Sequence, residues 1–139
     1  FNRKNQRQRK IMIKLTDILF EYVTKSDMRS IENYADKLFA AAGIDVDFTR
    51  HFRQRVNDER NIKPITAAEL IGVFKRTWKK YGKKLPELTA NAEAVIKDMR
   101  SDINMPFVFA QDKSGELDLI AKTIMRKKNF QTTNKILDI

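Results

Sequence analysis

Hydrophobic residues recur three or four positions apart in two long stretches of the chain. In the first, Ser26 or Asp27 can cap the start of a helix and Gly43 can end it; its apolar face comprises Ile31, Tyr34, Ala35, Leu38, Phe39 and Ala42. In the second, Thr66 and Glu69 form a capping box and Gly82 is the stop; its apolar face comprises Leu70, Val73, Phe74, Trp78 and Tyr81. The spacing predicts two amphipathic helices.

Three shorter stretches predict further helices or extended segments. IMIKLTDILFEYV, residues 11–23, reads as a short helix or a mixed element, and IDVDF over residues 44–48 alternates as a short strand or an extended entry to the next helix. Residues 49–60 can form a helix that buries Phe48, Phe52 and Val56, and one more short helix is predicted from Ala92 to Met99.

The C-terminal third has the pattern of strands. MPFVFAQ, the polar turn DKSG and ELDLIAKTIM predict a β-hairpin in which Gly115 supplies a positive φ, and residues 126–139 add an edge strand or remain extended. Helices first and strands last predict an α+β fold, with N-terminal helices packed on a small C-terminal antiparallel sheet.

The length of 139 residues predicts one domain. Residues 1–11 are basic and lack periodicity, so we expect a disordered extension before a single domain over residues 12–139; Met12-Ile-Lys-Leu is also typical of a native start. No apolar run reaches the length of a membrane span, and no signal-peptide pattern follows the basic start, so we expect an intracellular protein without a membrane partner.

The net charge of +10 lies at the two ends of the chain. Residues 1–14 carry six Lys/Arg and no acid, and residues 122–139 carry five against Asp138, whereas the residues between them are balanced. Such ends predict either a polyanionic partner, above all nucleic acid, or solvated tails that aid solubility.

The residue types present exclude many kinds of catalytic site. There is no cysteine and only one histidine, which excludes disulfides, thiolate metal sites and zinc sites built on several imidazoles; four scattered glycines exclude a glycine-rich phosphate loop. Asp45 and Asp47 can share one face of a strand and hold Mg²⁺, but alternating acids on an exposed strand are the commoner arrangement. We therefore expect no metal and no cofactor.

His51 lies four residues before Arg55, so the two side chains share one face of the predicted helix. A guanidinium binds phosphate oxygens with two donors, and an imidazole can exchange a proton near neutral pH, so the pair could form an anion site. The alternative is a surface histidine that packs on the hairpin.

The segment LIAKTIMRKKNF gives a second cluster of candidate residues. In a continuous strand, Lys122 and Arg126 stand on one face about 13 Å apart. Phe130 follows in a basic surround, where an aromatic ring could stack on a base. A basic row of this kind can equally protect a sheet edge from aggregation.

Taken together, these motifs resemble those of the toxin-like ribonuclease domains of the barnase/EndoU/colicin/RelE superfamily. HFRQRVNDERNIKPITAAELIGVFKR is similar to that group's His-x-x-x-Arg helix followed by an R-x-I-(S/T)-x-x-E-(L/I) helix start, and ELDLIAKTIMR to its final strand. The resemblance covers about residues 48–130. Residues 82–104 are longer and more helical in pattern than in that group. The whole chain also resembles small proteins of large tailed bacteriophages.

The resemblance implies a RelE- or barnase-like fold and metal-independent cleavage of RNA, in the cytoplasm of a bacterial host or in a virion. His51 would act as general acid or base; Arg55, Lys122 and Arg126 would stabilise charge on the phosphate, and Thr123 would position it. The implied RNA contacts are Arg50, Arg53, Lys127, Lys128 and Phe130. A non-enzymatic phage protein that binds nucleic acid or a virion component through its basic ends remains the alternative.

Overall fold

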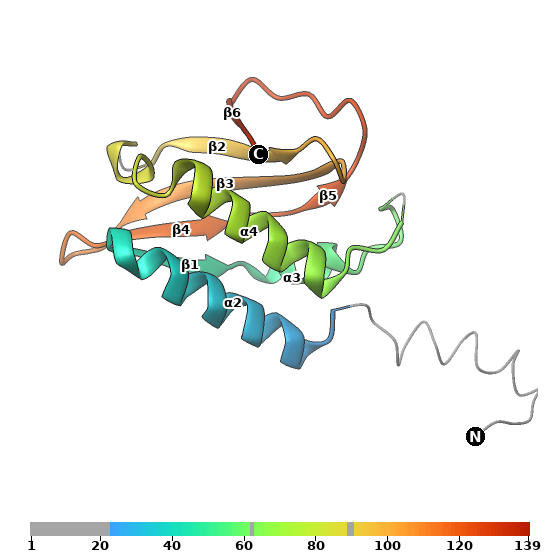
Figure 1. Ribbon diagram of the computed structural model, residues 1–139, viewed down its shortest axis with the longest axis horizontal. Coiled ribbons are helices and arrows are strands. Elements are labelled where there is room, and N and C mark those ends of the chain that lie inside the picture. The colour runs from blue at the N-terminus through green and yellow to red at the C-terminus, as the bar shows by residue number, and fades with distance from the viewer. Residues whose placement is uncertain (1–22, 62, 89–90) are drawn as a thin grey trace, which may run out of the picture.

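A six-stranded sheet with helices on one face forms the frame of the molecule (Figure 1). The computed structural model describes residues 23–61, 63–88 and 91–139. In it, α2 (Lys25–Phe39) and α4 (Ala67–Tyr81) lie side by side over the sheet, so the predicted α+β class is confirmed. The predicted extension over residues 1–11, and all but the last residue of the predicted element over residues 11–23, lie outside the described residues.

The sheet is mixed rather than antiparallel. Its strands are β1 (Ile44–Phe48), β2 (Glu93–Asp98), β3 (Ile103–Gln111), β4 (Leu117–Ala121), β5 (Met125–Arg126) and β6 (Lys135–Asp138). They are ordered β1-β4-β3-β2-β6, with β5 paired to the start of β3. The predicted β3–β4 hairpin and the edge strand β6 are confirmed. The antiparallel expectation was wrong at both edges, because β1 pairs with β4 and β6 with β2 in parallel.

Both long helices form where the apolar spacing predicted them. The capping box of Thr66 and Glu69 is confirmed. The predicted caps of α2 were wrong, because Thr24 is the N-cap and Asp27 is its reciprocal partner. After α2, the 3-10 turn Ala40–Ala42 ends at Gly43, whose φ of 72° confirms it as the stop.

The predicted helix from Ala92 to Met99 is wrong. The segment forms β2, which pairs with β3 on one side and β6 on the other. Ala94, Val95 and Ile96 are all buried there. Alanine, glutamate and lysine favour a helix, but burial between two strands outweighs that local preference. A 3-10 turn, Leu85–Glu87, precedes β2.

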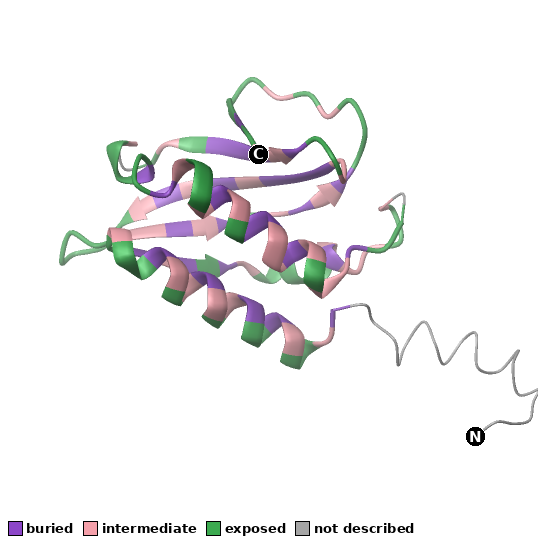
Figure 2. Cartoon of the chain, in the orientation of Figure 1, coloured by how far each residue is buried: buried purple, intermediate pink, exposed green. Residues whose placement is uncertain are grey.

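The core fills the space between the helices and the sheet, where the inward faces are buried (Figure 2). The ring of Phe39 from α2 meets Phe74 and Trp78 of α4 at centroid distances of 6.4 and 5.3 Å. On the outer edge of β1, the N–H groups of Val46 and Phe48 donate to Asp36 and Glu32 of α2. These bonds satisfy the donors of an edge strand and fix the end from which α3 starts.

Helix α3 (Arg50–Val56) is shorter than the predicted helix over residues 49–60. Phe52 and Val56 are buried as predicted. The chain turns after Asn57, because the side chains of Asp58 and Asn61 bind backbone groups that would otherwise continue the helix. None of the helices in the described ranges combines the length and apolarity that a bilayer span requires.

A candidate phosphate-binding cleft

The parallel pairing of β1 and β4 brings two distant segments together. Phe48 lies opposite Ala121, so both strands end at the same edge of the sheet. There the backbone N–H of Thr49 donates to the Ala121 carbonyl at 3.2 Å, and its hydroxyl donates to the Lys122 carbonyl at 2.9 Å. The same hydroxyl accepts from the N–H of Phe52 and caps α3. Helix α3 therefore begins against the end of β4.

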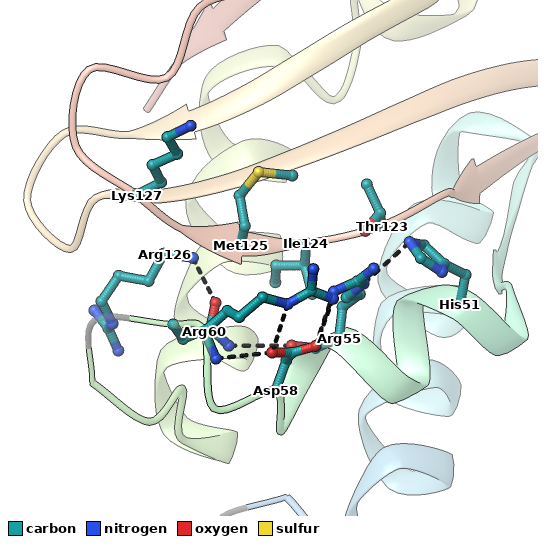
Figure 3. Close-up of a pocket in the computed structure, with 10 residues that line it drawn as sticks. His51, Arg55, Asp58, Arg60, Thr123, Ile124, Met125, Arg126 and Lys127 are labelled. Atoms are coloured by element: carbon teal, nitrogen blue, oxygen red, sulfur yellow. Dashed lines mark hydrogen bonds and ion pairs between the residues drawn. The ribbon is translucent and has the colours of Figure 1, made fainter.

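A cleft of about 540 Å³ lies between α3 and the segment that follows β4 (Figure 3). His51 and Arg55 line it from α3, and Thr123 to Lys127 line it from the opposite side. The turn after α3 completes it with Asp58, Arg60 and Asn61. Among the predicted site residues, His51, Arg55, Thr123, Arg126 and Lys127 thus meet around one cavity.

Three side chains of the cleft form a connected row. The Nε–H of Arg55 donates to Nε2 of His51 at 3.3 Å, and Nη1 of Arg55 donates to the Asp58 carboxylate at 2.8 Å (Figure 3). In this arrangement Nε2 of His51 is the acceptor, which corresponds to the tautomer that carries its proton on Nδ1. Arg55 is held between the imidazole of His51 and the carboxylate of Asp58.

Asp58 also binds the second arginine of the turn. Its carboxylate accepts from the backbone N–H of Arg60 at 2.7 Å and from its guanidinium at 3.1 and 3.0 Å. The side chain of Arg60 is 68% exposed, whereas that of Asp58 is 21% exposed. The lining contains Arg55, Arg60 and exposed Lys127 but only one carboxylate, that of Asp58, so it has an excess of positive charge.

Arg126 lines the cleft but its guanidinium is buried beneath it. Its donors reach the carbonyls of Lys63, Pro64 and Ser101 at 2.7 to 3.0 Å and the Glu69 carboxylate at 2.6 Å. Burial of Glu69 opposes ionisation, but the hydrogen bonds from Arg126 and Thr66 outweigh it and hold its pKa below the usual range. These bonds occupy Arg126, so its place is structural rather than at a bound phosphate.

The predicted common face of Lys122 and Arg126 is wrong, because the strand is interrupted. Ala121 lies opposite Phe107, so an unbroken register would place Ile124 opposite Asn104; instead Met125 lies there. One extra residue turns the following side chains to the other face. Lys122 consequently points away from the cleft and pairs with Glu93 at 2.8 Å, with both side chains 46% exposed.

Two asparagines shape the cleft, and sequence reasoning missed both. The amide of Asn61 donates to the carbonyls of Arg55 and Val56 and accepts from the N–H of Arg126, which ties the end of α3 to β5. The buried amide of Asn104 donates to the carbonyls of Asp102 and Lys127. Asn104 could have been found, because it is a polar residue inside an apolar strand pattern. No comparable sequence signal marks Asn61.

The remaining predicted contacts are spread around the cleft. Arg50 and Arg53 line a separate cavity, of about 530 Å³, and Arg53 pairs with Glu32 at 2.8 Å. Lys128 is exposed and Phe130 is half-buried in the segment after β5. Of the predicted RNA contacts, only Lys127 lines the cleft with His51.

The acidic pair on β1 lies on the sheet face opposite the helices. Asp45 lies opposite Asp118 of β4, and burial together with the charges of Glu32, Asp36 and Asp45 raises the pKa of Asp47. Within residues 23–61, 63–88 and 91–139, no group of three or more His, Cys, Asp or Glu side chains is arranged to hold a metal ion.

Comparison with known proteins leaves the geometry as the guide to function. No family model, curated protein or solved structure matches the chain.

Proposed function

We propose that the cleft binds the phosphodiester backbone of RNA and that the protein cleaves it without a metal ion. The observation that carries this proposal is the position of His51 beside Arg55, across a cavity from Thr123 and Lys127. An imidazole next to several cations is what a reacting phosphate diester requires, because a proton must move and negative charge must be stabilised.

The proposed reaction is attack of a ribose 2′-hydroxyl on the adjacent phosphorus. The new P–O2′ bond forms as the hydroxyl proton passes to Nε2 of His51, and the P–O5′ bond breaks as the leaving O5′ oxygen takes up a proton from solvent water. His51 then returns its proton to the solvent. The products are a 2′,3′-cyclic phosphate and a 5′-hydroxyl. Arg55, Arg60 and Lys127 would stabilise the charge on the phosphate oxygens, and the Thr123 hydroxyl would bind one of them.

Asp58 has a positioning role in this proposal. It holds Arg55 and Arg60 at the mouth of the cleft before RNA binds. For catalysis, Arg55 must exchange its bond to Nε2 of His51 for one to a phosphate oxygen, because Nε2 can accept a proton only when its lone pair is free. A phosphate entering the cleft supplies the acceptor that makes this exchange favourable.

The test is cleavage of mixed-sequence RNA in excess EDTA, with gel analysis of the products and of their ends. The intact protein should release fragments that carry 2′,3′-cyclic phosphates. His51→Ala should lower the rate at least about 100-fold, the lower range for a general acid–base group. Since His51 is exposed, the substitution should change the free energy of unfolding by less than about 0.5 kcal/mol.

Lys37→Ala is the control, because Lys37 is exposed on α2 and does not line the cleft. Undiminished cleavage by His51→Ala would refute the catalytic role of His51. RNA that is bound but left intact would instead favour the second candidate, a non-enzymatic nucleic-acid-binding protein. The observation behind that candidate is the exposure of Lys127, Lys128 and Lys135 near the C-terminus.

A further inference from the structure

A second concentration of positive charge lies at the other end of α4. The stretch KRTWKKYGKK, residues 75–84, holds six basic residues and no acid. Arg76 pairs with buried Asp98 at 2.5 Å. The five lysines are all exposed: Lys75, Lys79, Lys80, Lys83 and Lys84. We refer to these five as the α4 lysine cluster.

Local structure accounts for only part of this charge. A helix C-terminus carries the equivalent of about half a negative charge, so it can offset little of five lysines. Lys80 donates to the Asp138 carbonyl at 2.8 Å and lies 5.5 Å from the Tyr81 ring centroid. Within the part of the chain that the structure describes, none of the other four lysines forms an ion pair. The cluster therefore retains most of its charge for a partner.

The surface at the cluster is hollow rather than flat. A depression of about 330 Å³ is lined by Lys79, Lys80, Lys83 and Lys84, with Trp78 and Gly82 beside them. Lysines around a depression can direct their ammonium groups at one anion from several sides. A chain of phosphates offers such anions at regular intervals, and no carboxylate lines this depression.

We propose that the α4 lysine cluster is a second contact for the backbone of the RNA that occupies the cleft, which makes binding depend on RNA length. This inference rests on the proposed function for the identity of the partner. The N-terminal end of α4 lies beside the cleft, since Glu69 binds Arg126 there. The 15 residues of α4 span about 22 Å. A strand rising about 3.4 Å per nucleotide needs about seven nucleotides to cover that length.

The experiment compares 2′-O-methyl RNA oligonucleotides of five and 20 nucleotides, which cannot undergo 2′-hydroxyl attack. Fluorescence anisotropy would give Kd over a range of salt concentrations for the intact protein, for Lys79→Gln/Lys83→Gln and for Lys37→Gln/Lys113→Gln. The second pair is the matched control, because it removes the same charge from exposed positions outside the cluster and the cleft.

For the 20-mer, Lys79→Gln/Lys83→Gln should raise Kd about ten-fold at low salt and reduce the slope of log K against log salt by about 1.4, the loss of two single-strand phosphate contacts. The control pair should change Kd less than two-fold. Neither variant should alter binding of the five-mer, which is too short to reach the cluster from the cleft.

Equal effects of both variants on the 20-mer would overturn the proposal, because they would report net charge alone. The proposal would also be overturned if the protein did not bind the 20-mer but bound phosphatidylserine vesicles through Lys79 and Lys83. That result would identify a membrane surface as the partner. The proposed function can fail separately. An intact protein that does not bind the five-mer refutes the cleft as an RNA site, while the 20-mer comparison still tests whether the α4 lysine cluster binds RNA.

Discussion

At the scale of single residues, Arg126 shows how a side chain can lie at a site without acting in it. The sequence places it three positions after Thr123, where the resemblance implied a phosphate contact. In the fold its guanidinium bonds three carbonyls and one carboxylate, and the residue is only 3% exposed. These bonds fix the segment before α4 against β5, so Arg126 builds the wall of the cleft.

Replacing Arg126 should therefore lower the stability of the protein more than it weakens RNA binding. Arg126→Ala should lower the free energy of unfolding by about 3–5 kcal/mol, because it breaks the largely buried ion pair with Glu69 and removes the donor to three backbone carbonyls. Thermal unfolding followed by circular dichroism measures this, and Tm should fall by at least about 10 °C. Lys127→Ala is the adjacent control; its exposed side chain should leave Tm within about 2 °C. An Arg126→Ala protein with normal Tm and lost RNA binding would contradict the structural role.

At the scale of elements, local patterns predicted whatever depends on near neighbours. The apolar spacing and capping box of α4, the Gly43 stop and the β3–β4 hairpin are set within a few residues. The strand β2 and the extra residue before β5 depend on which strands pair, and no local signal records that. The site shares this limit: the His51–Arg55 pair follows from helical spacing, whereas the meeting with Thr123 required the parallel pairing of β1 and β4.

Gly82 illustrates an element boundary predicted correctly for the wrong reason. The helix ends there, but the φ of Gly82 is −47°, a value open to any residue. Its lack of a side chain matters because a Cβ would lie 2.2 Å from the Trp78 ring. Alanine normally stabilises such a position by about 0.4–1 kcal/mol, but the clash with a ring packed on Phe39 costs about 1–3 kcal/mol and prevails.

We therefore expect Gly82→Ala to lower the free energy of unfolding by about 1–2 kcal/mol and to shift the fluorescence of Trp78, the only tryptophan. Urea unfolding followed by that fluorescence measures both effects. Gly72→Ala in the same helix is the control, since its Cβ would meet the end of the long Arg76 side chain rather than a packed ring, and helix propensity favours alanine there. If the two variants were equally stable, packing against Trp78 would not explain the glycine.

At the scale of the whole molecule, charge is separated over different surfaces. The cleft and the α4 lysine cluster are basic, whereas the sheet face at β1 and β4 is acidic. Burial and the charges of Asp47 and Asp45 raise the pKa of Asp118, and the charge of Asp45 raises that of Glu116. Such a distribution orients an approaching polyanion toward the basic surfaces and repels it from this face.

The acidic face should make stability fall as pH rises. A raised pKa means that the folded state holds the Asp118 proton more tightly than the unfolded state does. The ionised carboxylate therefore destabilises the fold: this destabilisation is absent below the ordinary value of 3.8 and complete above the folded pKa. Asp118→Asn removes the charge, and should raise Tm by about 2 °C at pH 7, roughly 0.5 kcal/mol after solvent screening, with no gain near pH 3.

Asp112→Asn supplies a control of opposite sign in the adjoining turn. Hydrogen bonds from Ser114 lower the pKa of Asp112, so its carboxylate stabilises the fold above the ordinary value, and that contribution is lost as pH falls. Asp112→Asn should therefore lower Tm at pH 7, and this loss of Tm should shrink as pH falls below the ordinary value of 3.8. Thermal unfolding of both variants between pH 3 and pH 7 measures how the change in Tm depends on pH. If both variants changed Tm in the same direction, charge on this face would not explain the pH dependence.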